Sequence, residues 1–530
     1  MDSTAASGPR AGVREWLGLT ILALPTLLLS LDFSVTYLAV PHLSTDLGAT
    51  GPQQLWIADV YGFLVAGFLI PMGTLGDRIG RRKLLLIGAA VFCLASVAAA
   101  FSTSPEMLIA ARAAMGIGGA TLMPSTLALI SNMFKDPKQM GTAIAIWMSC
   151  FMGGMALGPV VGGVLLGSFW WGSVFLIGVP VLVLLLVTGP ILLPEYRDPG
   201  AGRVDLLSVL LSLVAVLPIV YGFKELAKSG FALVPTLVLL AGLVLAVVFV
   251  LHQRRLSHPM VDMRLFGNRT FTTVMVITLV GAILQAGTYF LVVQSVQGVD
   301  GLSPMRAGLL LAPVSLVMVV GINVGAALAK RIRPGNLFAI GFLLAAAGYL
   351  LITTVDGPGH LVELWVGYAI MAVGTGLPSG LGTGLLLGSA PPEKAGSVSS
   401  LSEVSGEFGM SMGVAVLGSV GTVAYHSQLS ATLPAGLPPD VTATAMDNIA
   451  LAESAAQRVP GELGAQLLDA ARIAFTSGLR IVAVIGAVLF VVLAAYAATA
   501  LRHLPPTGAE PDDLGEAPEE AGAAKADHHA

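Results

Sequence analysis

The sequence predicts an all-α polytopic membrane protein, and three observations lead to that prediction. Of the 530 residues, 55% are hydrophobic and only 11% are charged, whereas a soluble domain has roughly 25% charged residues. The mean hydropathy is +0.85. Apolar runs of about 20 residues recur along nearly the whole chain, and a helix of that length crosses a hydrocarbon core of roughly 30 Å.

Fourteen membrane-spanning helices are expected when the apolar runs are read against proline, glycine and charge breaks. The first run is taken as a span because it is too long for a signal-peptide core and is not followed by a small-residue cleavage site. The expected spans are residues 16–40, 53–75, 83–101, 105–132, 139–166, 170–193, 204–224, 231–252, 270–295, 304–329, 336–355, 360–388, 396–425 and 472–501.

A faint internal repeat suggests two related halves, which is how many secondary transporters are built. The segment "LGDRIGRR" (75–82) resembles "LAKRIRPG" (328–335). The expected segments are an N-terminal tail (1–15), a first six-helix bundle (16–193), two extra central helices (204–252), a second six-helix bundle (270–503) with an external loop (426–471), and a disordered acidic tail (504–530).

Basic residues indicate the orientation of the chain. An even number of spans places both termini on one side, and most Lys and Arg residues fall in the loops of that side. The alternate loops carry only Lys224, Lys228, Arg306, Arg458 and Arg472. Because cytoplasmic loops are enriched in Lys and Arg, both termini are expected in the cytoplasm and the protein in the cytoplasmic membrane.

Several classes of protein find no support. Cys93 and Cys150 lie inside apolar runs, where cysteine behaves as a small hydrophobe. Adjacent His528 and His529 in the tail do not make a metal site, so we expect no metal, no cofactor and no nucleic-acid partner. No GxSxG, HExxH or P-loop pattern occurs, which argues against an enzyme and against ATP-driven transport by this chain alone.

Three charged residues are expected at one depth in the outer half of the membrane. Counted at 1.5 Å per residue from the nearest span end, Asp32, Asp59 and Arg112 lie roughly 13, 9 and 10 Å deep. Placing an ionisable side chain at this depth costs free energy, so we expect these residues to have a specific role. One arginine can neutralise one carboxylate and leave the other to bind a proton or a cation. We assign Arg112 to Asp32 and Asp59 to the substrate; a merely structural Asp32–Arg112 bridge is the alternative.

Further polar and aromatic residues are candidates for a binding cavity. Glu403 and Glu407 are spaced i, i+4 on one face of a span, although Glu403 could simply lie in water near the cytoplasmic end. Aromatic rings that could hold a cation are those of Tyr37, Trp56, Tyr61 and Tyr289. Trp56, Trp170 and Trp171 could equally be interface anchors.

Five motifs resemble those of the major facilitator superfamily, from about residue 16 to residue 503. "GTLGDRIGRRK" (73–83) matches its cytoplasmic-loop signature, and "GMALGPVVGG" (154–163) matches the fifth-helix motif of antiporters. "RAAMGIGGA" (112–120) resembles the fourth-helix motif. "LDFSVTYLAVP" (31–41) and "LWIADVYGF" (55–63) resemble the first two helices of fourteen-span drug:proton antiporters, in particular exporters of quaternary ammonium compounds.

The resemblance implies roles for these motifs. A gating latch is implied for Gly73, Gly76, Asp77, Arg78, Gly80, Arg81 and Arg82. An antiporter motif that resists leak is implied for Gly154, Gly158, Pro159, Gly162 and Gly163. It also implies proton coupling by Asp32, tuned by Arg112, and cation attraction by Asp59. Some relatives carry an acid in helix ten, where this chain offers only Asn323 as a polar candidate.

The expected function is a proton-coupled multidrug efflux antiporter. It would export lipophilic, mainly cationic compounds as a monomer, with the proton gradient as its energy source. Proton-coupling residues would be Asp32, Arg112 and Glu407. Substrate-binding residues would be Asp59, Trp56, Tyr61, Glu403, Tyr37, Tyr289 and Asn323. The alternatives are an exporter of one antibiotic or metabolite, an uptake symporter and a membrane-embedded enzyme.

Overall fold

The computed structural model describes residues 10–197, 205–229, 232–256, 259, 263–389, 395–459 and 461–507, and these form helices and connections without a strand. The first seven helices are α1 (Val13–Leu47), α2 (Gly51–Ile79), α3 (Arg81–Ala100), α4 (Pro105–Met133), α5 (Pro137–Ser168), α6 (Ser173–Leu176) and α7 (Gly178–Leu192). Two more helices, α8 (Leu206–Ser229) and α9 (Leu233–Arg255), follow.

The second part of the chain begins with a short 3-10 helix, η1 (Met263–Gly267), and α10 (Arg269–Gln294) continues into a π-helical turn, η2 (Ser295–Val299). The remaining helices are α11 (Pro304–Leu328), α12 (Pro334–Ile352), α13 (Leu361–Gly388), α14 (Ala395–Thr432), α15 (Pro439–Asp447), α16 (Ile449–Ala456) and α17 (Glu462–Ala500).

The prediction of an all-α multi-pass fold is confirmed. Within the described residues, twelve helices are long and apolar enough to cross a membrane. The helix α2 is not among the twelve, and α8 contributes only a shorter apolar stretch, Leu207–Ile219. Both occupy places where spans were expected, so the number fourteen stays a prediction.

Local sequence signals explain where several helices begin. The side chains of Ser104, Asp136, Asn268 and Ser303 accept hydrogen bonds from the free backbone amides of the first turns of α4, α5, α10 and α11. Proline stands in the first turn of α4, α5 and α11, where its missing N–H costs nothing. These caps satisfy donors that would otherwise be left unpaired at the helix ends.

Two large hydrophobic clusters organise the molecule. One is built from residues of α1 to α7 together with the segments next to them, and the other mainly from α10 to α17. We call these helix groups the first and second halves. Between them α8 packs against α2 and α14, and α9 packs on α8. The expected domain boundaries are not tested by this packing and stay a prediction.

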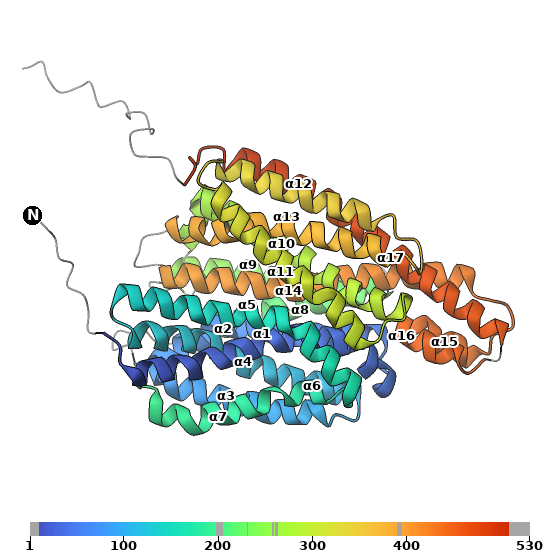
Figure 1. Ribbon diagram of the computed structural model, residues 1–530, viewed down its shortest axis with the longest axis horizontal. Coiled ribbons are helices and arrows are strands. Elements are labelled where there is room, and N and C mark those ends of the chain that lie inside the picture. The colour runs from blue at the N-terminus through green and yellow to red at the C-terminus, as the bar shows by residue number, and fades with distance from the viewer. Residues whose placement is uncertain are drawn as a thin grey trace, which may run out of the picture.

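The two ends of the described chain lie at the same end of the molecule (Figure 1). Near the start, the Ala11 amide donates to the Gln139 side chain at the beginning of α5. Near the end, the Thr507 amide donates to the Ala329 carbonyl just after α11. We call this the terminal end. The opposite end carries α15 and α16, within the segment expected as an external loop, and we call it the α15–α16 end.

Most of the two expected tails lies outside the described residues. This applies to residues 1–9 and to 508–530, the latter including His528 and His529. Cys93 and Cys150 are free thiols. Among the described residues, no group of three or more His, Cys, Asp or Glu side chains could hold a metal ion.

Candidate functional site

A buried ion pair joins α1 and α4. Nη1 of Arg112 lies 2.7 Å from Oδ2 of Asp32, and these side chains are only 1% and 5% exposed. The Nε of Arg112 donates to the carbonyl of Ile57 on α2, at 3.3 Å. The arginine therefore ties three helices together at one level, and the structure pairs it with the carboxylate that the sequence assigned to it.

Aromatic rings enclose the guanidinium of Arg112. Its Cζ lies 4.7 Å from the ring centroid of Tyr61 and 5.8 Å from that of Phe175. Desolvated cation–π contacts of this kind contribute about 2 kcal/mol. The ring of Tyr61 is thus occupied by an internal cation, although Tyr61 also lines a cavity described below. Phe175 belongs to α6, and the sixth expected span is formed by α6 and α7.

Asp59 lies buried on α2, two residues after the carbonyl that Arg112 contacts, with 1% of its surface exposed. This matches the expected common level with Asp32 and Arg112. Asp59 interacts with other groups of the protein. It lines neither of the two cavities described next, whereas Glu403 and Glu407 line one of them.

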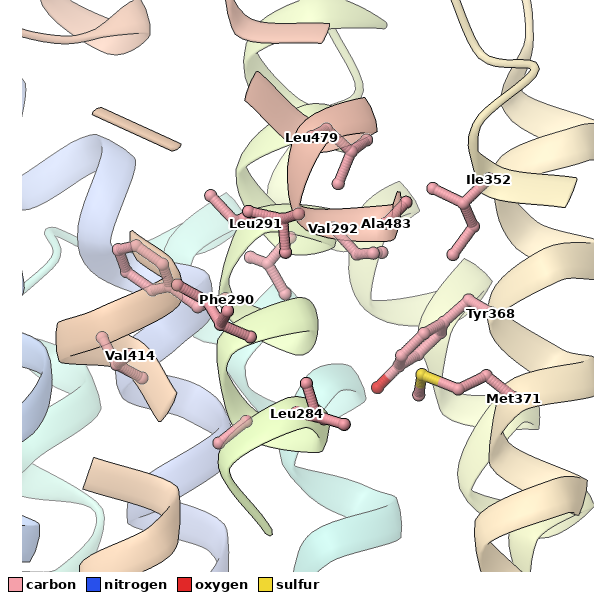
Figure 2. Close-up of a cluster of buried hydrophobic side chains, with 14 of the residues drawn as sticks. Leu284, Phe290, Leu291, Val292, Ile352, Tyr368, Met371, Val414, Leu479 and Ala483 are labelled. Atoms are coloured by element: carbon pink, nitrogen blue, oxygen red, sulfur yellow. The ribbon is translucent and has the colours of Figure 1, made fainter. Parts of the chain in front are cut away.

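The larger of these cavities, about 170 Å³, lies between the halves, and we call it the aromatic cavity. Its walls come from α1 and α5 on one side and from α10, α11, α13 and α14 on the other. Tyr289 and Tyr368 are stacked in its wall, with ring centroids 6.3 Å apart. Figure 2 shows Tyr368 reaching from α13 toward α10.

A second cavity of about 80 Å³, the acidic cavity, lies next to the first. It is lined by α1, α2, α4 and α5 of the first half and by Glu403, Glu407 and Met410 of α14. Oε1 of Glu403 is buried and has no hydrogen-bond partner among the residues the structure describes. Both glutamates therefore face one enclosed space, as their i, i+4 spacing suggested.

The other aromatic and polar candidates are placed differently. Tyr37 is buried and packs edge-on against Phe33, Tyr289 and Phe290 without lining either cavity. Trp56 is half-buried and lines neither of them. Asn323 is exposed and donates to the Val319 carbonyl of its own helix. Asn323 and Trp56 therefore do not line the aromatic or the acidic cavity, described above.

The glycine motif of α5 has two faces. Gly154, Gly158 and Gly162 form one stripe that packs on α1, where a Cβ at Gly154 or Gly158 would overlap Ser30 or Ser34. The other face meets α11. A Cβ at Gly163 would lie 2.8 Å from the Pro304 carbonyl oxygen, and the Pro159 carbonyl occupies the place of a Cβ at Gly308. The motif therefore closes the first half internally and joins it to the second half.

Further contacts join the two halves at the α15–α16 end of the molecule. Gln297 in η2 donates to the Leu38 carbonyl of α1 at 3.1 Å. Asn448, which caps α16, donates to the Ala49 carbonyl at 3.1 Å. Leu38 lies in the last third of α1 and Ala49 lies just beyond its end, so these contacts hold the halves together toward the α15–α16 end.

The loop between α2 and α3 is tied to the end of α7. Gly80 ends α2 at a φ of 112°, a conformation that favours glycine. Arg82 donates from Nη1 to the carbonyls of Pro190 and Leu193, and its Nε lies 3.6 Å from Glu195. Arg81 is 8% exposed and lies over Gly76. Gly73 has open space around it. Arg78 is exposed. The side chain of Asp77 is outside the described part of the structure.

Sequence reasoning missed several residues of this site. Glu195 follows the sixth span, and its position opposite a basic loop is a signal that could have identified it. Phe33 lies inside the motif 31–41, and Gln285 is a polar residue within an expected span, so both carried a signal that could have identified them. Tyr368 looks like an ordinary residue of an apolar helix, and no local pattern distinguishes it. Only the packing of the halves brings these three residues to a common space.

Comparison with known proteins places the chain among transporters. The profile of the Major Facilitator Superfamily matches residues 22–414. The multidrug efflux pump LfrA of Mycolicibacterium smegmatis is 41% identical over 94% of this chain and 98% of that protein. The methyl viologen resistance protein SmvA of Salmonella typhimurium is 36% identical over 87% and 93%. The tetracenomycin C resistance and export protein of Streptomyces glaucescens is 31% identical over 98% and 95%.

Solved structures show the same fold. A bacterial homologue of the human lysosomal transporter Spinster, in an inward-facing and unoccupied conformation, aligns with a TM-score of 0.67 at 20% sequence identity. The alignment covers 93% of this chain and 98% of that chain.

Proposed function

Because this chain belongs to the major facilitator superfamily, we propose that it is a proton-coupled multidrug efflux antiporter for lipophilic, mainly cationic compounds. The observation that carries the proposal is the pair of glutamates facing a cavity between the halves, close to a buried Asp–Arg pair. Relatives named for multidrug efflux and methyl viologen resistance, aligned over most of both chains, support it.

Proton coupling is assigned to Asp32, Arg112 and Glu407. A proton on Asp32 would remove its attraction to Arg112 and loosen the tie between α1, α2 and α4. A buried pair that loses one charge is strongly unfavourable, by roughly 3–5 kcal/mol, so protonation can drive a rearrangement. Glu407 in the acidic cavity would carry either a proton or the charge of the drug, which makes the two exclusive.

The remaining assignments follow from the same proposal. The terminal end lies in the cytoplasm and the α15–α16 end outside the cytoplasmic membrane, with the gating loop on the inner face. The chain works as a monomer without a cofactor, and it is not an enzyme. Substrate contacts come from Glu403, Tyr61 and Tyr289, with Asp59 as a buried source of negative potential.

A dedicated exporter of one compound is the second candidate. It is favoured by the similarity to the tetracenomycin C resistance and export protein, which extends over 98% of this chain. A transport panel separates the two, because a dedicated exporter would move one chemical class only.

The function is tested with purified protein in liposomes with an imposed pH gradient. Uptake of tetraphenylphosphonium and ethidium into vesicles that are acidic inside is expected to exceed that of protein-free vesicles at least tenfold. Each cation should release protons from the vesicle interior, since exchange moves the two in opposite directions. Cation movement in the direction of the proton, or movement that persists after the gradient is collapsed with an ionophore, contradicts antiport.

Asp59→Asn is expected to reduce export of cations about tenfold and of uncharged drugs less than twofold. The physical reason is that a buried carboxylate lowers the potential felt by a cation in the neighbouring cavities, whereas an uncharged drug does not respond to it. Initial rates of export with matched cationic and neutral compounds give the measurement. Asp440→Asn, at an exposed position on α15, is the matched control. An equal loss for both kinds of drug would leave Asp59 without a charge-specific role.

A further inference from the structure

The two cavities share one wall. Phe33 of α1, Met155 of α5 and Met410 of α14 line both the aromatic and the acidic cavity. These side chains can change rotamer without moving a helix, and methionine in particular adapts to irregular shapes. The two spaces are therefore compartments of one site, separated by a partition of three adjustable side chains.

The compartments differ in chemistry. Two carboxylates, those of Glu403 and Glu407, line the acidic cavity. The aromatic cavity is lined by no charged side chain and contains the stacked rings of Tyr289 and Tyr368. Four methionines and three aromatic rings line this cavity and offer a flat apolar group a large contact surface: Met152, Met155, Met318, Met410, Phe33, Tyr289 and Tyr368.

Polar groups in the aromatic cavity are held loosely. The hydroxyl of Tyr289 is buried and has no hydrogen-bond partner among the described residues. The Nε2 of Gln285 donates to the sulfur of Met318 at 3.4 Å, and a thioether is a weak acceptor. Both groups could form a better hydrogen bond with an acceptor on a ligand, because buried polar groups gain from being satisfied.

Size also argues for joint use of the compartments. Pockets for drug-sized ligands measure roughly 300–1,000 Å³, whereas the cavities here measure about 170 and 80 Å³. Neither alone holds such a molecule. A ligand too large for either cavity must reach across the partition and touch both linings. Because the two spaces together are still smaller than the drug-sized range, the ligand that fits them is a compact one.

From these observations we infer that the site takes cations whose charge is separated from a planar aromatic group by a short linker. The charged group binds in the acidic cavity and the ring binds beside Tyr289 and Tyr368, with the linker crossing between Phe33, Met155 and Met410. Tyr368 is then a specificity-determining residue. This inference rests on the proposed export of lipophilic cations and adds which cations fit.

The test uses naphthyl-alkyl-trimethylammonium compounds with linkers of one to six methylenes, together with their uncharged tert-butyl analogues. Binding to the purified full chain is measured by calorimetry. An optimum at an intermediate linker length is expected, with affinity at least tenfold above that for the shortest linker. Affinity that rises steadily with each methylene would reflect hydrophobicity alone and would overturn the inference.

Two substitutions then separate the compartments. Tyr368→Leu should weaken the naphthyl compounds about tenfold, charged or not, and leave decyltrimethylammonium within twofold. Glu407→Gln should weaken the charged compounds about tenfold and leave the uncharged analogues within twofold. Because the ring and the charge lie in separate spaces, the two effects on the optimal ligand should add in the double variant. If both variants weaken only the charged compounds, the ring and the charge do not bind in separate compartments.

Controls keep the outcome interpretable. Tyr368→Phe retains the ring and should bind as the wild type does, which shows that the ring and not the hydroxyl is needed. Retained binding of decyltrimethylammonium shows that Tyr368→Leu is folded. Tyr221→Leu and Glu462→Gln make the same changes at exposed positions of α8 and α17. Failure of the proposed function is distinct, because the wild-type protein would then exchange none of the charged compounds for protons. Proton exchange with no linker optimum would instead overturn only the present inference.

Discussion

Replacing Asp32 with asparagine is expected to abolish drug-induced proton movement in vesicles while the protein still folds and binds drug. Asparagine keeps the shape of the side chain and an oxygen that can accept a hydrogen bond from Arg112, which lies 2.7 Å from the native carboxylate. It cannot bind and release a proton in the physiological pH range. The measurement is the fluorescence of a pH dye inside vesicles when a cationic drug is added.

The control for Asp32→Asn lies on the same helix. Asp46→Asn makes the identical change at an exposed position near the end of α1 and should leave proton movement unchanged. Thermal melting in detergent shows whether Asp32→Asn unfolds the protein, because the Arg112 charge is then buried with a weaker partner. A full proton signal in a folded Asp32→Asn protein would move the coupling role to Glu407.

Gly308→Ala is expected to reduce exchange more than tenfold by disturbing the contact between the halves. The added methyl group would occupy the place of the Pro159 carbonyl oxygen of α5, so the two helix backbones must separate. This contact lies at the end where Gln297 and Asn448 also join the halves. The variant should therefore close poorly there, and spin labels at Ser168 and Arg306 should move apart in a cysteine-free background.

A second glycine of α11 provides the comparison. At Gly325 a Cβ would likewise overlap a carbonyl oxygen, that of Leu377 on α13, but this contact lies inside the second half. Gly325→Ala should lower the melting temperature by a similar amount without changing the label distance. If both variants lower the melting temperature and neither separates the labels, α5 and α11 do not form a moving contact.

Much of the fold could be predicted from the chain. Thirteen of the fourteen expected spans overlap one α-helix of the described residues, and the sixth overlaps α6 and α7, although α2 and α8 are not among the twelve helices that are long and apolar enough to cross a membrane. Apolar length and proline or charge breaks report on helices because a chain in lipid must satisfy its own backbone hydrogen bonds. The sixth span was less regular than expected, since α6 and α7 replace one continuous helix. Phe175 of α6 lies against Arg112, and no local pattern predicts this long-range contact.

The candidate site was only partly predictable. Asp32, Asp59 and Arg112 could be assigned to one level, because depth follows from counting residues along a helix. Which carboxylate faces open space could not, because that depends on how helices rotate against one another. Asp59, the residue most favoured for meeting the substrate, is buried outside both cavities, while Glu403 and Glu407 face one of them.

The sequence by itself determined the class of protein, the helices, the family motifs and the pairing of Arg112 with Asp32. These depend on composition, on residues close together in the chain, or on a charge too costly to bury alone. Only the tertiary structure decided that α5 joins both α1 and α11 through opposite faces and that Phe33, Met155 and Met410 separate two compartments. Such features depend on close packing between segments far apart in the chain, where a single methyl group decides whether two helices can touch.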